Sequence, residues 1–412
     1  MKKLRSFSLA LLALGVSTLA HAAGNGDYSQ VERGRYLAVL GDCAACHTSG
    51  VEGSKPFAGG VSLQTPFGVL MGANITPDPD TGIGKWTFDD FQRAMSEGVG
   101  HDGIRLYGAM PFTAYTKVTK ADNRAIWEYL QTLQPVHNAV QTNQLPFPFN
   151  IRTSLIAWNW INFDQGAFIP DLKKSADWNR GAYIVEGLGH CGTCHTPKNL
   201  LGGDKNSEFL RGAVVEGWMA PDITVNNHTG LGKWTIEDIT AYLKNGSNRF
   251  DMASGPMAEE VKNSSNLWTD ADLKAVAVYL KDSGHDSGSK APEPIKTNDS
   301  SMIAGKAIYA DRCSACHTPN GAGQEGLFPR LANSPLIVSD NATSLIHVVL
   351  AGSRPVDTHA APTAPGMPSF ADNMSDADVA NVLTYIRNSW GNSAAAVSSG
   401  DVKSLRKNLR EE

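Results

Sequence analysis

Three short stretches of the sequence each place two cysteines and a histidine within five residues. They are Cys43-Ala-Ala-Cys46-His47, Cys191-Gly-Thr-Cys194-His195 and Cys313-Ser-Ala-Cys316-His317. In a C-x-x-C-H run the two thiols can bond covalently to the two vinyl groups of a haem, and the adjacent imidazole can reach the iron. The spacing therefore predicts three covalently attached haem c groups, with the six cysteines forming thioether bonds to the vinyl groups and the three histidines as axial ligands of the iron.

The alternative interpretation of these motifs is structural zinc. The chain has 6 cysteines, and the three motifs use all of them, so no thiol remains for a disulfide or a further zinc ligand. A zinc site would also need Cys or His at ligand spacing after each motif. Other histidines, such as His101, His228 and His347, hold no common position relative to the motifs. Haem is the prediction that accounts for all three motifs.

Three methionines are the candidates for the second axial ligand of each iron. They are Met110 in YGAMPF, Met257 in SGPMAEE and Met367 in PGMPSF, at 63, 62 and 50 residues after the motif histidine. Each lies beside a proline, in sequence that predicts a loop. Thioether ligation raises the potential of a haem and is typical of electron carriers.

Methionine is more commonly a gap-filling core residue. Met71 and Met219 form a repeated pair without a counterpart near the third motif, and we predict that they pack in the core or at a haem edge. Met252 and Met374 are lesser candidates. If three thioethers occupy the sixth positions, no iron is open to substrate, and we find no other catalytic motif. The sequence thus predicts electron transfer and no catalytic residue.

The first 22 residues predict a secretory signal peptide. A basic start precedes an apolar run from Phe7 to Leu19, and the small-residue site Ala20-His21-Ala22 predicts cleavage before Ala23. The apolar run is too short to span a bilayer, and no later segment approaches the roughly 20 apolar residues that a membrane helix needs. Haem is attached to C-x-x-C-H outside the bacterial cytoplasm, so both features predict a periplasmic protein.

Length and charge limit the organisation further. Removal of the signal peptide leaves 390 residues, or 130 for each motif, which suits three small domains. The mature chain would hold 33 basic and 41 acidic residues, a net charge of −8. This balance argues against nucleic acid as a partner.

Each motif lies in a repeated helical frame. Before the motif, an apolar pattern at helical spacing surrounds a glycine; after it, a helix opens with Thr or Ser and carries Asp three residues later, which predicts an N-cap. The glycines are Gly34, Gly181 and Gly305, and the later helices contain Tyr129, Tyr279 and Tyr385, which we predict to be packing residues. The first two repeats share a G-K-W-T segment, with Trp86 beside N-cap Thr87 and Trp234 beside N-cap Thr235.

The predicted fold class is all-α, with three tandem class I cytochrome c domains. They span residues 27–140, 171–281 and 301–392, called here the first, second and third repeats. The connector 141–170 is rich in aromatic residues, so it either packs across domains or contacts a partner. Residues 282–300 predict a flexible linker.

The tail, residues 393–412, offers only a weak apolar stripe of Val402, Leu405 and Leu409 near basic residues. This pattern is compatible with a surface helix, a solvated end or a docking peptide.

The order of these motifs resembles a known family. The segments RGRYLAVLGDCAACHT, KPFAGG, NITPD, TGIGKWTFDDF, YGAMPF and LPFPFN are similar to those of the three-haem cytochrome c subunits of membrane-associated bacterial dehydrogenases, typified by gluconate 2-dehydrogenase and quinoprotein alcohol dehydrogenase. The likeness covers essentially the whole mature chain.

The resemblance implies a catalytic partner subunit carrying flavin or PQQ and acting on gluconate, an alcohol or a sugar, with a small third subunit as an optional further partner. It implies ubiquinone or a terminal oxidase of the respiratory chain as acceptor, and peripheral contact with the periplasmic face of the inner membrane. It also implies that His47, His195 and His317 are proximal ligands, and that Met110, Met257 and Met367 are distal ligands.

Two other functions are compatible with the motifs. One is a free-standing periplasmic electron shuttle, which would lack a catalytic partner. The other is peroxidase-type catalysis, which requires an iron with a vacant or displaceable sixth position. The aromatic segment WNWINF at 158–163 favours a subunit of a complex, because a lone carrier has little use for it.

Overall fold

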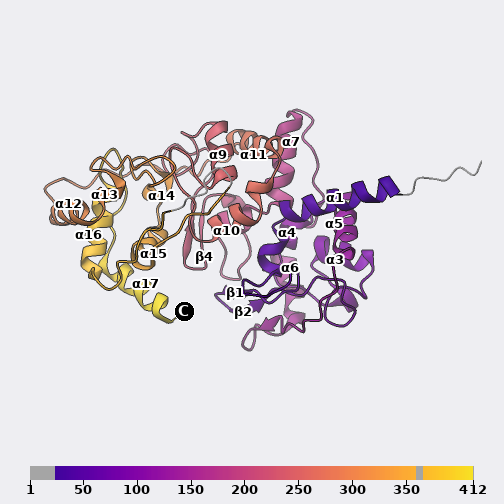
Figure 1. Ribbon diagram of the computed structural model, residues 1–412. Helices are drawn as coiled ribbons and strands as arrows, with labels where there is room; N and C mark the ends of the chain where they lie inside the picture. Colours follow the sequence, from indigo (N-terminus) through magenta and orange to yellow (C-terminus); the bar gives the residue numbers. More distant parts are fainter. Residues whose placement is uncertain (1–23, 359–364, 412) are drawn as a thin grey trace, which may run out of the picture.

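The computed structural model describes residues 24–358 and 365–411, and these are mostly helical (Figure 1). The predicted signal peptide, residues 1–22, lies outside the described residues. No helix among those described is long and apolar enough to cross a membrane.

Helices dominate each repeat, and short strands interrupt the first two. The first repeat contains α1 (Gly24–Leu40), α2 (Cys43–His47), β1 (Ser62–Thr65), β2 (Gly68–Met71), α3 (Phe88–Glu97), η1 (His101–Gly103), α4 (Phe112–Tyr115) and α5 (Lys120–Gln131). The connector contains β3 (Asn143–Gln144), η2 (Arg152–Ser154) and α6 (Leu155–Asn162).

The second repeat contains α7 (Ala176–Tyr183), η3 (Ile184–Leu188), α8 (Gly192–His195), η4 (Asn206–Glu208), β4 (Ala213–Val215), β5 (Trp218–Ala220), α9 (Ile236–Asn245), α10 (Pro256–Asn263), η5 (Ser265–Leu267) and α11 (Asp270–Asp282). The third repeat and the tail contain α12 (Ser300–Arg312), α13 (Ser314–His317), α14 (Pro335–Val338), α15 (Thr343–Ala351), α16 (Asp376–Arg387) and α17 (Ser399–Glu411).

A glycine lies at the crossing of the first and last helices of every repeat. The pairs are α1 with α5, α7 with α11 and α12 with α16. A Cβ atom on Gly34, Gly181 or Gly305 would lie 1.9, 2.0 or 2.1 Å from a backbone oxygen of the partner helix, and within 2.8 Å of the Cβ atom of the predicted tyrosine. The three glycines therefore let two helix backbones touch, in the same way in each repeat.

The predicted N-caps are present. The side chains of Thr119, Thr269 and Ser375 accept a hydrogen bond from the backbone N–H three residues on, at the starts of α5, α11 and α16. Thr87 and Thr235 cap α3 and α9 with complete capping boxes. These local patterns satisfy helix-end donors that would otherwise lack partners, which is why the sequence locates the helix starts.

The expectation of an all-α fold misses two hairpins. Strands β1 and β2 pair antiparallel and are extended by β3 of the connector, and β4 pairs antiparallel with β5. In the second hairpin Glu216 and Gly217 both have positive φ, 50° and 71°, as a tight two-residue turn requires. The strands are only two to four residues long, too short to show an alternating pattern in the sequence.

The first and second repeats share one apolar core. Buried residues of both repeats, including Leu37, Ile126, Ile184 and Leu273, belong to a single cluster, whereas the third repeat has a core of its own. Figure 1 shows the third repeat at the left, the second in the middle and the first at the right. The third repeat meets the second through α15 and β5, where the rings of Trp218 and His347 stack with centroids 4.0 Å apart.

The connector packs across repeats on one side and is exposed on the other. The ring of Trp158 lies 6.3 Å from that of Phe112 in the first repeat, and its Nε1–H donates to the carbonyl of Leu201 in the second, at 2.7 Å. Trp160, two residues further on and so on the other side of the helix, is 88% exposed. One face of α6 therefore packs across the repeats, which was the first of the two alternatives for this connector. The opposite face is exposed, and contact with a partner stays a prediction for it.

The segment expected to be a flexible linker is hydrogen-bonded to both of its neighbours. Asn226 donates to the carboxylate of Asp286 at 2.8 Å, and the backbone N–H of Ile295 donates to Asn388 at 3.1 Å. Residues 283–296 nevertheless form no helix or strand. The Ser, Gly and Asp residues that suggest a solvated linker are also good hydrogen-bonding residues, so composition alone does not separate the two states.

The tail also differs from expectation, because α17 packs against the third repeat. Val402 is fully buried, and Leu405 and Leu409 pack against the same core. The Nε–H of Arg406 donates to Asp376 at 2.7 Å. The apolar stripe of the tail thus contacts protein in this structure.

Candidate haem sites

The motif cysteines lie in three short helices or, for Cys191 and Cys313, at the N-cap directly before them. All six are free thiols, and only Cys316 is exposed. Burial raises the pKa of Cys43 and Cys191 to about 12 and that of Cys313 to about 11, with smaller contributions from nearby charges. Each motif thus presents two thiols without a disulfide between them, as covalent attachment to the vinyl groups of a haem requires.

Each motif imidazole is anchored through one nitrogen by a backbone carbonyl. The Nδ1–H of His47 donates to Ala73 at 2.6 Å, that of His195 to Pro221 at 2.7 Å, and that of His317 to Pro329 at 3.0 Å. Burial lowers the pKa of all three histidines, against the opposing effect of these hydrogen bonds. A neutral imidazole with its Nδ1 proton fixed presents Nε2 as a metal ligand.

The two hairpins deliver the first two of these carbonyls. Ala73 follows β2 and Pro221 follows β5, and each lies 26 residues after its histidine. In the third repeat, whose described residues form no hairpin, the separation is 12. We did not predict these acceptors from the sequence.

A sequence signal for the two acceptors was present in NITPD and its counterpart DITVN. The side chains of Asn74 and Asp222 accept from the backbone N–H of Thr76 and Thr224, at 3.0 and 2.8 Å, and so form a turn directly after the carbonyl. Both threonines are fully buried. This turn therefore holds in place the carbonyl that accepts a hydrogen bond from the motif histidine.

Within the described residues, no group of three or more His, Cys, Asp or Glu side chains converges as a set of metal ligands. A zinc site made by the protein alone would need such a group. A haem brings four nitrogen ligands of its own and needs only axial side chains and thiols from the protein. The paired thiols and the carbonyl-anchored imidazoles fit haem c.

The methionines predicted as distal ligands are half-buried, in three different settings. Met110 packs against the core that also contacts Cys43, and Met367 packs against the third core with Cys313. Met257 contacts a small cluster that includes Val261, next to Tyr242 of the main core.

The prediction that all three distal candidates lie in loops is wrong for Met257. This residue is in the first turn of α10, with Pro256 at the first helical position. Proline suits that position because it has no N–H to satisfy and its φ is already helical, so the Gly-Pro pair starts a helix here.

The other methionines occupy core or strand positions. Met71 lies in β2 and Met219 in β5, both half-buried. Met374 is buried in the third core, and Met252 forms a backbone bridge with Ser247.

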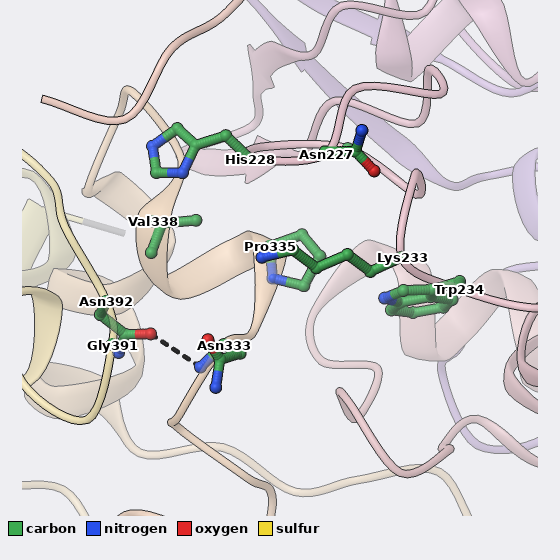
Figure 2. A pocket seen from close by; sticks show the side chains of 10 residues that line it. Asn227, His228, Lys233, Trp234, Asn333, Pro335, Val338, Gly391 and Asn392 are labelled. Carbon is green, nitrogen blue, oxygen red and sulfur yellow. Dashed lines mark hydrogen bonds between the residues drawn. The ribbon is translucent and has the colours of Figure 1, made fainter.

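Figure 2 shows a small polar pocket at the contact between the second and third repeats. His228, Lys233 and Trp234 line one side, and Asn333 donates its backbone N–H to Asn392 on the other, at 2.7 Å. The cavity measures about 20 Å³. That volume suits one water molecule, so this pocket is not a haem site.

Each repeat has two helices that cross at a glycine, a C-x-x-C-H motif and an imidazole anchored by a carbonyl. Together these features define a c-type cytochrome. A family model described as Cytochrome c matches residues 31–134 and 302–390. The chain is 39% identical to the gluconate 2-dehydrogenase cytochrome c subunit of Pantoea cypripedii, over 97% of this chain and 95% of the relative.

The cytochrome c subunit of the quinone alcohol dehydrogenase of Gluconobacter oxydans is 34% identical, over 98% of this chain and 88% of the relative. The fructose dehydrogenase cytochrome subunit of Gluconobacter japonicus is 36% identical, over 91% and 82%. The chain belongs to this family of dehydrogenase cytochrome c subunits. It is therefore an electron-transfer protein that binds haem c covalently.

Proposed function

We propose that this chain is a periplasmic tri-haem electron-transfer subunit. It receives electrons from a catalytic dehydrogenase subunit that carries flavin or PQQ and oxidises gluconate, an alcohol or a sugar, and it passes them to ubiquinone or the respiratory chain. The observation that carries the haem count is the threefold recurrence of one arrangement: a glycine helix crossing, a C-x-x-C-H helix and an imidazole held by a carbonyl. Three tandem cytochrome c domains follow from the same recurrence.

Each domain contributes the same set of functional groups. Two thiols of each motif attach the group covalently, the motif histidine presents Nε2 to the iron, and we assign Met110, Met257 and Met367 as the distal ligands. Haem c with His and Met ligands supplies a one-electron couple of relatively high potential. With one histidine and one methionine side chain holding each iron, the haems would supply one-electron transfer and substrates would be excluded from the iron.

Replacing each proposed distal methionine singly by alanine is expected to change one haem and leave the others as they were. The potential of that haem should fall by on the order of 0.1 V, since axial ligands set haem potentials over about 0.8 V. Spectroelectrochemical titration of the full-length protein measures this. Met71→Ala is the matched control, because this half-buried methionine lies in a strand. A silent variant would move the ligand assignment in that domain to another residue, with Met252 and Met374 tested next.

The exposed face of α6 is the proposed docking surface for the dehydrogenase. Ile156 and Trp160, one helical turn apart, are 56% and 88% exposed, while Leu155 and Asn159 of the same helix are buried. Exposed aromatic and aliphatic side chains on a fixed element are typical of the energetic centre of protein interfaces. The packing of Trp158 fixes this face against the first two domains.

The experiment is to purify the tagged chain from membranes in mild detergent and follow the haem absorbance while adding gluconate, ethanol, glucose, sorbitol and an aldehyde in turn. Reduction by one of them identifies both the partner and its substrate. In the variant Ile156→Ser with Trp160→Ser this reduction should be lost while dithionite still reduces the haems. Leu172→Ser, at a site 97% exposed away from α6, is the control and should behave as the unmodified chain.

If dithionite reduces the haems and no substrate does, even after crosslinking before extraction, the free shuttle replaces the proposed subunit. If reduction survives in the α6 variant, the docking surface lies elsewhere.

A further inference from the structure

The first and second domains exchange a reciprocal pair of hydrogen bonds between equivalent positions. The hydroxyl of Tyr36 on α1 donates to Asp272 of α11, and the hydroxyl of Tyr183 on α7 donates to Asp122 of α5, both at 2.6 Å. Each tyrosine lies two residues after the crossing glycine of its own domain. Each aspartate lies three residues after the N-cap of the last helix of the other domain.

The same two hydroxyls also replace a contact that is normally made within one helix. The N-cap N–H of Thr269 donates to Tyr36 at 3.1 Å, and that of Thr119 donates to Tyr183 at 3.2 Å. In the third domain, by contrast, the N-cap N–H of Ser375 donates directly to Asp378 and closes a capping box. At the starts of α5 and α11, a tyrosine from the neighbouring domain thus takes the hydrogen bond that would otherwise close a capping box.

Both aspartates are buried and paired with an arginine. Asp122 is 3% and Asp272 is 7% exposed. Arg33 of the first domain bonds Asp122, and Arg180 of the second bonds Asp272 at 2.7 and 2.9 Å. Each buried carboxylate therefore has a cation from its own domain and a hydroxyl from the other. Buried charge needs such partners, and removal of one leaves a desolvated group unpaired.

The third domain cannot make this exchange. The positions that correspond to Arg33 and Tyr36, counted from the crossing glycine, hold Ala304 and Ala307. It contacts the second domain through other groups, among them Ser344, which accepts from the backbone N–H of Met219 at 2.7 Å. The exchange is specific to the first two domains.

The exchange brings the first two haem-attachment segments together. Ser264 donates to the carbonyl of Val39 at 2.7 Å, His190 contacts the carbonyl of Gly41 at 3.3 Å, and α10 packs against α2. The chain segments around the first two motifs are therefore in direct contact.

We propose that Tyr36 and Tyr183 are positioning residues that lock the first two domains into one rigid two-haem unit and set the approach of its haems for electron exchange. This inference rests on the proposed function. The third domain, which lacks these tyrosine hydrogen bonds, is then a separate unit. The physical basis of the inference is the pair of hydrogen bonds from Tyr36 to Asp272 and from Tyr183 to Asp122.

The test uses the full-length holoprotein with Tyr36→Phe, Tyr183→Phe and both together. Two haems held in a fixed, close orientation couple their Soret transitions, which gives a bisignate circular-dichroism band. In the double variant we expect this band to fall by roughly twofold or more, since two hydrogen bonds to buried charges are lost, with haem content and dithionite reduction unchanged. Tyr129→Phe is the matched control: it removes a hydroxyl at the α1–α5 crossing that has no hydrogen bond to the second domain among the described residues, and it should leave the band unchanged.

If the double variant loses haem, the single variants decide. Because the two contacts join equivalent positions and are equally short, each single variant should weaken the band by a similar fraction. The proposed two-haem unit is overturned if the band is unchanged in all variants. It is also overturned if the unmodified protein has its full haem content and shows no bisignate band. A reference protein without covalent haem would instead overturn the proposed function.

Discussion

A chain in which Cys191 and Cys194 are both replaced by alanine is expected to lose one third of its covalent haem while it retains the other two thirds. The reason is that the six cysteines serve three separate motifs, two to each, and no other cysteine exists in the sequence to substitute for them. Pyridine haemochrome absorbance per mole of protein measures the ratio, which should fall from three to two. The anchored His195 would remain in place but without a covalent tether for the group.

The paired replacements at Cys43 with Cys46, and at Cys313 with Cys316, are the matched controls. Each should remove an equal share of haem. A haem-to-protein ratio that falls from two to one would show that one motif carries no haem. That motif would be the one whose replacement leaves the ratio unchanged. A chain that retained stoichiometric zinc in place of haem would contradict the assignment altogether.

Replacing Gly305 by alanine is expected to destabilise the third repeat, although alanine is the better helix former. Helix propensity alone would favour alanine by about 1 kcal/mol. A Cβ atom at this position, however, would lie 2.1 Å from the carbonyl oxygen of Asn381, a backbone atom that cannot rotate away. Separating α12 from α16 would open the core around Tyr309 and Leu383. A net loss of about 3 kcal/mol or more is expected, as for other overpacked cores.

Thermal unfolding of the holoprotein, followed by circular dichroism and limited proteolysis, measures this effect. A loss of about 3 kcal/mol in a domain of this size lowers its melting temperature by roughly 10 to 20 °C. Gly50→Ala is the control, because a Cβ atom there would meet nothing within 4 Å. Equal melting temperatures for the two variants would mean that the helices can part without cost, and the glycine crossing would lose its structural role.

Much of the frame could be predicted because its signals are local. The N-caps Thr119, Thr269 and Ser375 lie three residues from the aspartates that identify them, and the structure has each helix start there. The crossing glycines were visible as a repeat, although only the structure gives the reason for them. The hairpins were missed because strands of two to four residues carry almost no periodic signal.

Other features depended on packing between distant residues. The composition of the tail suggested a segment apart from the third repeat, but Val402 of α17 is buried in the core of that repeat. The proline beside Met257 suggested a loop, and in the folded chain it starts α10. The exchange between Tyr36 and Asp272 joins residues 236 apart in sequence, and neither residue is unusual by itself.

The sequence by itself determined the chemistry of attachment, because a C-x-x-C-H motif needs only five consecutive residues to place two thiols and an imidazole together. It also determined the helical frame, through caps and glycines that act over a few residues. Only the tertiary structure decided which carbonyl orients each imidazole, which face of α6 stays exposed, and how the first two domains are joined. Those choices are made by hydrogen bonds and packing between segments far apart in the chain, whose partners become neighbours only when the core has formed.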